Sequence, residues 1–166
     1  MTHRIGTLGF AVALLFATSA RAQISAPPTL QGQPSVHVWT VPGVINNGGL
    51  GTFFTCTNTL GSTVTVGVEV FGPAGEAALD DASATSLSVA PGATVMFGTT
   101  QPGSFVADGN LAPGFVTKRS ARVLATTSSK ASPQILCTAL LADSISSVPT
   151  VMTTLPVIRK TTQQGD

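Results

Sequence analysis

The stretch STVTVGVEVF, Ser62 to Phe71, constrains the fold more than any other part of this sequence. Valine occupies every second position of it, and the residues between the valines are mostly polar or small. Successive side chains of a β-strand point to opposite faces, so this pattern lines one face with valine. Such alternation predicts a half-buried antiparallel strand. The valines of that face are Val64, Val66, Val68 and Val70.

Other stretches rich in β-branched residues lie between turn residues and predict further strands. They cover residues 35–41, 52–58, 85–90, 94–100, 120–127, 134–142 and 150–158.

Proline and glycine suggest how these strands are connected. Pro42-Gly43 is expected to end the first strand, and Pro91-Gly92 to turn the chain back on itself. We expect strands 120–127 and 134–142 to pair, with the second placed centrally. The first and last strands, 35–41 and 150–158, are expected to be exposed edges, and Pro156 fits an edge or a strand end. Residues 75–84 could make one helical turn but are interpreted as a polar loop.

Seven or eight strands in this length predict an all-β fold, an antiparallel β-sandwich with Greek-key connections. The expected organisation is one sandwich domain over residues 35–158. A flexible proline-rich lead covers 23–34 and a polar tail covers 159–166.

The first 22 residues have the pattern of a secretory signal peptide. Arg4 gives a positive start, Leu8 to Ala17 form an apolar run, and Ala20-Arg21-Ala22 fits a small-x-small cleavage site. Cleavage after Ala22 would leave a chain beginning at Gln23. The alternative, a membrane anchor, needs about 20 apolar residues. We therefore expect a secreted or periplasmic protein with no transmembrane segment after cleavage.

Charge is sparse. Charged residues make up 9% of the chain, and its formal net charge is +1. Removing residues 1–22 removes two arginines and leaves six basic against seven acidic residues, a net charge near −1. A nearly neutral chain has no long-range field to draw it to nucleic acid, so no nucleic-acid partner is expected. Self-association or an unknown protein partner stays open.

The two cysteines, Cys56 and Cys137, are expected to form a disulfide. An exported chain with an even cysteine number usually pairs them. A redox pair normally has the C-x-x-C spacing, and a metal site needs further His or Cys ligands. The sequence shows neither arrangement.

Two stretches, CTNTLGSTVTVGVEVFGPAGE and SLSVAPGATVMFGT, resemble exported bacterial immunoglobulin-like or fibronectin-like domains. The shared pattern is a strand ending in Asn, an alternating valine strand, a GPAG-type turn, and a leucine strand entering a Pro-Gly turn. The resemblance covers roughly residues 55–99. It implies an immunoglobulin-like sandwich, and such domains serve as spacers, adhesive modules and assembly subunits.

The glycine-rich stretch VINNGGLGTFFTCTN could suggest a ligand loop. A dinucleotide loop needs G-x-G-x-x-G before a helix, and a P-loop needs G-K-[ST]. Here a strand follows and the third glycine is missing, so we expect a turn at Asn47-Gly48.

Candidates for chemistry are few. His37 is the one histidine after residue 22 and lies in a predicted strand; a Ser-His-Asp site is formally possible, but a structural histidine is preferred. Asp80-Asp81 with Glu76, and Asp108 in space, could bind calcium or form a solvated loop. Lys118-Arg119 with Arg122 could dock an acidic partner or be a soluble strand end. Phe105 and Phe115 could be exposed loop contacts.

These observations predict an exported, non-enzymatic protein with a structural or protein-interaction role and without catalytic residues, metal or cofactor. The alternative is a small-ligand module, for calcium or carbohydrate, that uses loops at one end of the domain. Sugar binding has little support, because such modules usually present exposed Trp or Tyr and this chain has one tryptophan and no tyrosine.

Overall fold

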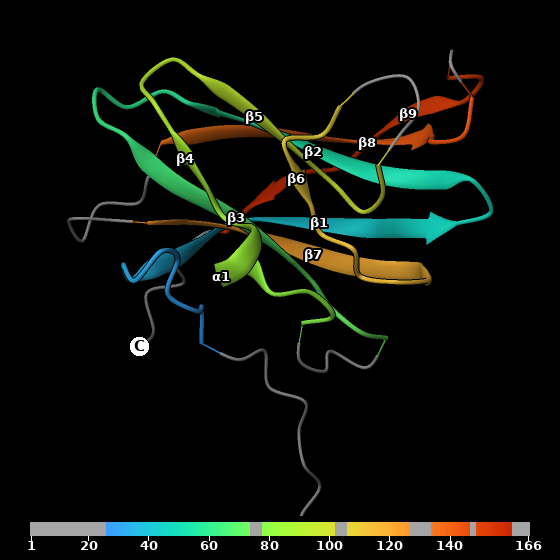
Figure 1. Cartoon of the computed structure of the whole chain (residues 1–166), viewed down its shortest axis with the longest axis horizontal. Coiled ribbons are helices and arrows are strands. Elements are labelled where there is room, and N and C mark those ends of the chain that lie inside the picture. The colour runs from blue at the N-terminus through green and yellow to red at the C-terminus, as the bar shows by residue number, and fades with distance from the viewer. Residues whose placement is uncertain (1–25, 74–77, 102–105, 127–133, 147–148, 161–166) are drawn as a thin grey trace, which may run out of the picture.

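The computed structural model describes residues 26–73, 78–101, 106–126, 134–146 and 149–160, which form an all-β fold of ten strands (Figure 1). The pairing is antiparallel except for β6, which runs parallel to β5. The strands are β1 (Ser35–Asn47), β2 (Leu50–Asn58), β3 (Val64–Val70), β4 (Leu87–Val89), β5 (Thr94–Gly98), β6 (Gly109–Asn110), β7 (Val116–Thr126), β8 (Ile135–Asp143), β9 (Met152–Leu155) and β10 (Ile158–Arg159).

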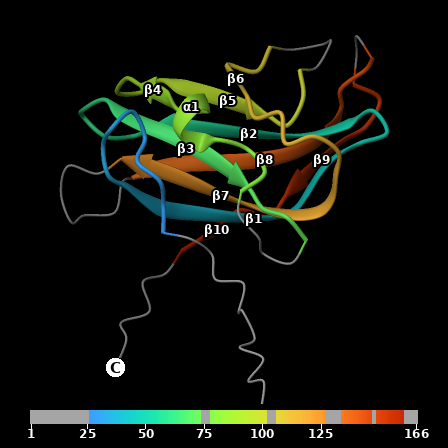
Figure 2. The same cartoon turned by 60° about the horizontal axis from the view of Figure 1, so that its bottom comes forward.

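The ten strands are hydrogen-bonded into one sheet with two arms. The first arm has the order β10-β1-β7-β3-β4 and the second β6-β5-β2-β8-β9. The hairpin of β1 and β2 joins them, through the pairs Asn46–Gly51 and Asn47–Leu50. Figure 2 shows the arms from a second direction. The predicted all-β antiparallel class is confirmed, whereas the predicted separation into two sheets with Greek-key connections is not established by this pairing.

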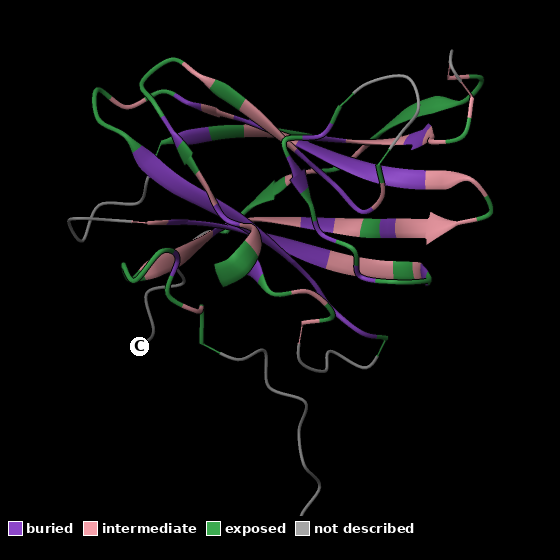
Figure 3. Ribbon diagram, in the orientation of Figure 1, coloured by how far each residue is buried: buried purple, intermediate pink, exposed green. Residues whose placement is uncertain are grey.

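Side chains from both arms form one buried apolar cluster. The first arm contributes the valines of β3 and of β1, and the second arm contributes Phe54, Phe97 and Ile135. All seven residues of β3 are buried (Figure 3), so the expectation of a half-buried strand is wrong. Its second face is covered by Leu30 and by Ala82, which approach Gly67 closely. Leu30 is fully buried, so this described part of the proline-rich lead packs against the sheet.

The strand positions agree with the prediction better than their partners do. Strands 120–127 and 134–142 do not pair with each other: β7 lies between β1 and β3, and β8 lies between β2 and β9. The expected exposed edge at residues 35–41 is also wrong, because β1 has β7 on one side and β10 and β2 on the other.

Two loops also differ from the expectation. Pro91-Gly92 does turn the chain, but it carries the chain from β4 in the first arm to β5 in the second. Within the predicted polar loop 75–84, Asp81 caps the short helix α1 (Ala82–Thr85) by accepting hydrogen bonds from Ser83 N and Ala84 N.

The glycine-rich stretch forms a turn, as predicted, one residue further along the chain. Gly48 and Gly49 occupy its two central positions with φ of +59° and +83°. Both values lie in the left-handed region, which glycine adopts without steric cost, and two such residues suit a tight hairpin. The turn delivers β2, and with it Cys56, into the core.

Cys56 and Cys137 lie directly opposite each other in the ladder of β2 and β8. Their sulfur atoms are 2.15 Å apart, so the pair is at disulfide distance. The bridge therefore links neighbouring strands of one arm.

Residues 1–22 and 161–166 lie outside the described part of the chain, so the signal-peptide prediction and most of the tail are not tested. No helix among the described residues is long and apolar enough to cross a membrane.

Candidate functional site

Two β-bulges face each other where β1 runs beside β7. Pro42 pairs with Ser120 and Val44 with Arg119, which leaves Gly43 as an extra residue on β1. Gly43 has φ +85°, a conformation that glycine adopts readily. β1 therefore continues through Pro42-Gly43, where the sequence predicted its end. Gly43 is accommodated as the extra residue of a β-bulge, so pairing with β7 resumes at Val44 and the strand continues.

The second bulge lies on β7. Val44 pairs with Arg119 and Asn46 with Val116, so β7 has one more residue than β1 over this interval. Lys118 lies in this bulge with φ +54°, an uncommon value for a residue with a side chain. Bulges next to binding sites redirect side chains, and strained backbone clusters at such sites.

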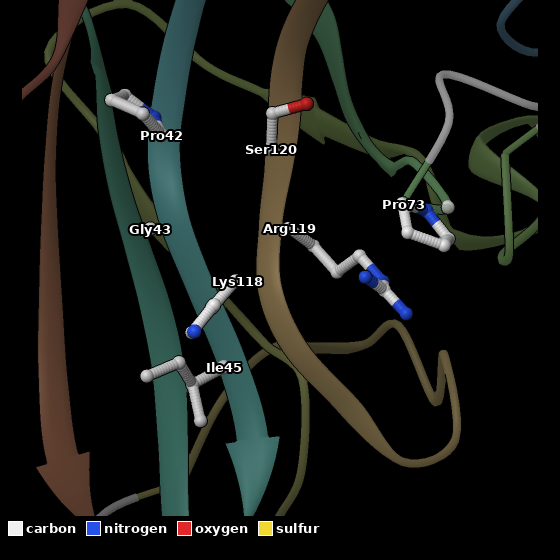
Figure 4. A pocket seen from close by; sticks show the side chains of 8 residues that line it. Pro42, Gly43, Ile45, Pro73, Lys118, Arg119 and Ser120 are labelled. Atoms are coloured by element: carbon white, nitrogen blue, oxygen red, sulfur yellow. The ribbon is translucent and has the colours of Figure 1, made fainter.

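The facing bulges open a pocket of about 420 Å³ on the surface. Figure 4 shows Lys118 on the side of Ile45 and Arg119 extending toward Pro73. The walls come from three segments that are distant in sequence, and most of the exposed lining is apolar. The lining residues are Pro42, Gly43, Ile45, Gly72, Pro73, Lys118, Arg119 and Ser120.

The Arg119 guanidinium is incompletely satisfied. Its Nε atom is buried and has no hydrogen-bond partner among the residues that the structure describes. A buried donor without an acceptor costs about 1–3 kcal/mol. None of the lining residues that the structure describes is acidic. Glu76, which follows Pro73 by three positions in the sequence, lies outside the described residues.

Arg122 does not belong to the exposed basic cluster that the sequence suggested. It is buried and donates from Nε to Glu69 Oε2, the residue directly opposite it across β3 and β7. Its guanidinium also lies 5.1 Å from the centre of the Phe71 ring. A buried charge is stable only when it is paired, so Arg122 serves the interior of the fold. The surface cluster reduces to Lys118 and Arg119.

His37 contacts its own strand. Its Nε2 atom lies 3.0 Å from Trp39 O and 3.0 Å from Thr40 Oγ1. Burial lowers the pKa of His37, which the hydrogen bond to Trp39 partly opposes. Neither of these two contacts is with a carboxylate, the group that would orient His37 as a catalytic base.

Each of the described acidic residues considered for calcium accepts hydrogen bonds from the backbone. Asp80 accepts from Val70 N, Asp81 caps α1, and Asp108 accepts from Met96 N. Within the described ranges, no group of three acidic, histidine or cysteine residues is placed to hold a metal ion. Burial raises the pKa of Asp80 to about 7.

Exposed apolar side chains gather where β7, β8 and β9 meet the hairpin turn. Cross-strand pairing aligns the ends of five strands here. The successive partners are Val116, Asn46, Gly51, Ala142 and Met152. Four large side chains lie at or next to this line of partners with 49% to 76% of their surface exposed. They are Phe115, Ile145, Val151 and Met152. Phe115 is exposed, as predicted, and Phe105 lies outside the described residues.

β9 forms one edge of the second arm, whose other edge is β6. Among the described strands β9 pairs with β8 alone, and its first three residues are exposed. Asp143 N donates to Val151 O, and hydrogen-bonded pairs recur every second residue in an antiparallel ladder. Thr153 and Leu155 therefore direct their backbone groups toward β8, whereas Met152 and Thr154 direct theirs toward the open edge.

The sequence identified Lys118, Arg119 and the edge at 150–158. It missed the pocket, because the pocket depends on two bulges that face each other across strands far apart in sequence. A glycine within a β-branched stretch, as at Gly43, was the available signal.

Compared with known proteins, the chain matches no family model, no curated protein and no solved structure.

Proposed function

We propose that this chain is an exported, non-enzymatic β-sandwich protein that binds another protein through the open edge of β9. The observation that carries the proposal is the combination of a free backbone edge with an uncharged segment. From Ser144 to Ile158 the sequence contains no Asp, Glu, Lys or Arg. Soluble proteins usually protect an edge strand with charge, a bulge or a covering segment.

The open edge is short and well defined. Pro149 and Pro156 flank β9, and proline cannot donate to a strand partner. Met152 and Thr154 leave backbone donors and acceptors toward the edge, and the neighbouring Val151 adds exposed apolar surface. An extended segment of a partner can add to such an edge through main-chain hydrogen bonds, while its side chains contact the apolar residues.

The proposal of a sandwich rests on the apolar cluster. The two arms share one buried core, although among the described strands the β1–β2 pair is the only backbone pairing between them. Pro156 separates β9 on the second arm from β10 on the first. Strands that pass between two layers in this way are found at the edges of sandwiches. We propose that the two arms are the two sheets of an immunoglobulin-like sandwich.

The proposal of export rests on two features. The first 22 residues have the pattern of a signal peptide, and Cys56 and Cys137 lie at disulfide distance. Disulfides persist in oxidising compartments such as the periplasm and the extracellular space. Mass spectrometry of protein recovered from the envelope and the medium tests both, through the N-terminus at Gln23 and the mass of the bridged form.

The binding proposal is tested by replacing one edge residue. Thr154→Pro removes a backbone donor that points away from β8, and Thr154→Lys places a charge there. Thr138→Lys is the matched control, because Thr138 is exposed on β8, which has strands on both sides. Each variant is used to recover partners from the envelope of the producing cell, with quantitative mass spectrometry.

We expect wild type and Thr138→Lys to retain the same partner and both Thr154 variants to lose it. Hydrogen exchange at Met152 and Thr154 should slow when the partner is added. Equal recovery by all four proteins, or protection elsewhere on the surface, contradicts binding at this edge.

A further inference from the structure

We propose that the pocket between the two bulges binds a carboxylate attached to a small apolar group. This goes beyond the proposed strand addition, which uses a different edge of the molecule. The pocket is lined by Lys118, Arg119 and Ser120, and none of its described lining residues is acidic. An anion is the ligand class that two cations and a hydroxyl favour.

Arg119 gives the most specific indication. Its Nε is buried without an acceptor among the described residues, while its guanidinium extends along Pro73 (Figure 4). The Nε–Nη edge of a guanidinium matches a planar carboxylate, which accepts two parallel hydrogen bonds. A bound carboxylate would supply the acceptor that Nε lacks. A guanidinium that the fold itself required would be expected to have its own acceptor, as Arg122 has in Glu69.

The walls of the pocket indicate the rest of the ligand. Pro42, Ile45 and Pro73 provide apolar surface around the two cations, and its volume of about 420 Å³ lies within the usual range for small-molecule sites. An aliphatic or aromatic acid with one carboxylate fits this combination. The same chemistry is presented by the free C-terminus of a peptide that ends in an apolar residue.

The second cation of the pocket is Lys118, and the bulge on β7 determines the direction of its side chain. The bulge on β7 holds its backbone at φ +54°, and this turns its side chain toward Ile45 while Arg119 lies on the other side of the strand. On a regular strand, consecutive side chains would point to opposite faces of the sheet. Lys118 and Arg119 therefore line the same pocket from opposite sides of β7, and Arg119 carries the unsatisfied donor.

Titration calorimetry at low salt tests the site. The probes are hexanoate, benzoate and, as neutral isosteres, hexanamide and benzamide. We expect the carboxylates to bind and the amides to give no heat. A peptide ending in leucine, with a free or an amidated C-terminus, distinguishes a peptide source from a free acid: stronger binding of the free C-terminus than of either small acid assigns the site to peptide ends.

Three variants locate the binding. Arg119→Gln removes the guanidinium, and we expect it to weaken carboxylate binding roughly tenfold to a hundredfold, the range for a charge-assisted hydrogen-bonded pair. Arg119→Lys keeps the charge but loses the planar fork, and we expect it to recover only part of the affinity. Lys160→Gln is the control, because it removes one exposed positive charge outside the pocket.

The proposal is overturned if no carboxylate binds wild type, or if Lys160→Gln weakens binding as much as Arg119→Gln does. Arg119→Met separates a binding role from a structural one without any ligand. We expect its urea midpoint to equal or exceed that of wild type, because the variant removes a buried donor without an acceptor. A clearly lower midpoint would show that the fold uses Arg119, and it would also overturn the assignment.

Discussion

Reduction of the Cys56–Cys137 bridge should lower the free energy of unfolding by an amount determined by the length of the loop that the bridge closes. The bridge spans 81 residues of sequence. The chain-entropy relation gives about 4.5 kcal/mol at 25 °C for a closed loop of that length. The two cysteines already face each other in the ladder of β2 and β8, so reduction need not change the pairing of the folded state. The effect should therefore arise mainly in the unfolded chain.

Urea unfolding followed by the fluorescence of Trp39 measures this effect. Trp39 is the one tryptophan, and its Nε1 donates to Ile135 O at 2.8 Å, so unfolding changes its environment. With an m-value of about 2 kcal/mol/M, reduction should lower the midpoint by about 2 M. Cys56→Ala with Cys137→Ala is the control, and a reductant should not change its midpoint. A shift below about 0.5 M in wild type would refute the entropic argument.

Three further substitutions probe the fold, each by urea unfolding. Burial raises the pKa of Asp80 to about 7, so its folded carboxyl holds a proton that the unfolded one releases near pH 4. Stability should therefore fall as pH rises from about 4 to about 7, by up to about 1.4 kcal/mol per pH unit, and Asp80→Asn should abolish this slope; an unchanged slope contradicts the assignment. Gly43→Ala forces a side chain into φ +85° and should cost about 1–2 kcal/mol, whereas Gly61→Ala, in open space without positive φ, should cost much less. Asn58→Ala removes hydrogen bonds to Ser62 O, Val89 O and Leu60 N from a fully buried position and should cost about 3 kcal/mol; a loss below about 1 kcal/mol would show that other groups replace them.

The strands could be predicted from sequence because alternation is a local property. The valines of β3 and the Thr and Phe residues of β2 specify extended chain wherever it lies in the fold. Pairing could not be predicted in the same way, since it depends on residues far apart. Strands 120–127 and 134–142 are neighbours in sequence with apolar faces, yet each finds two other partners in the structure.

The candidate site shows the same limit. The sequence places Arg122 beside Lys118 and Arg119, and nothing local indicates that it is buried. Its burial follows from Glu69, which the ladder of β3 and β7 brings directly opposite. Conversely, the local sequence predicts a strand end at Gly43, because the compensating bulge at Lys118 lies on another strand.

The β1–β2 hairpin has a consequence for how quickly the chain folds. Each arm contains one long ladder, β1 with β7 and β2 with β8, and both ladders join segments far apart in sequence. Hairpins form in about 1–10 μs, whereas folds dominated by distant pairings take milliseconds to seconds. The hairpin supplies the first strand of both ladders. Its turn at Gly48-Gly49 therefore positions β1 and β2 relative to each other before β7 and β8 pair with them. A side chain at Gly49, whose position would meet Ile145, should therefore slow the folding of both arms together.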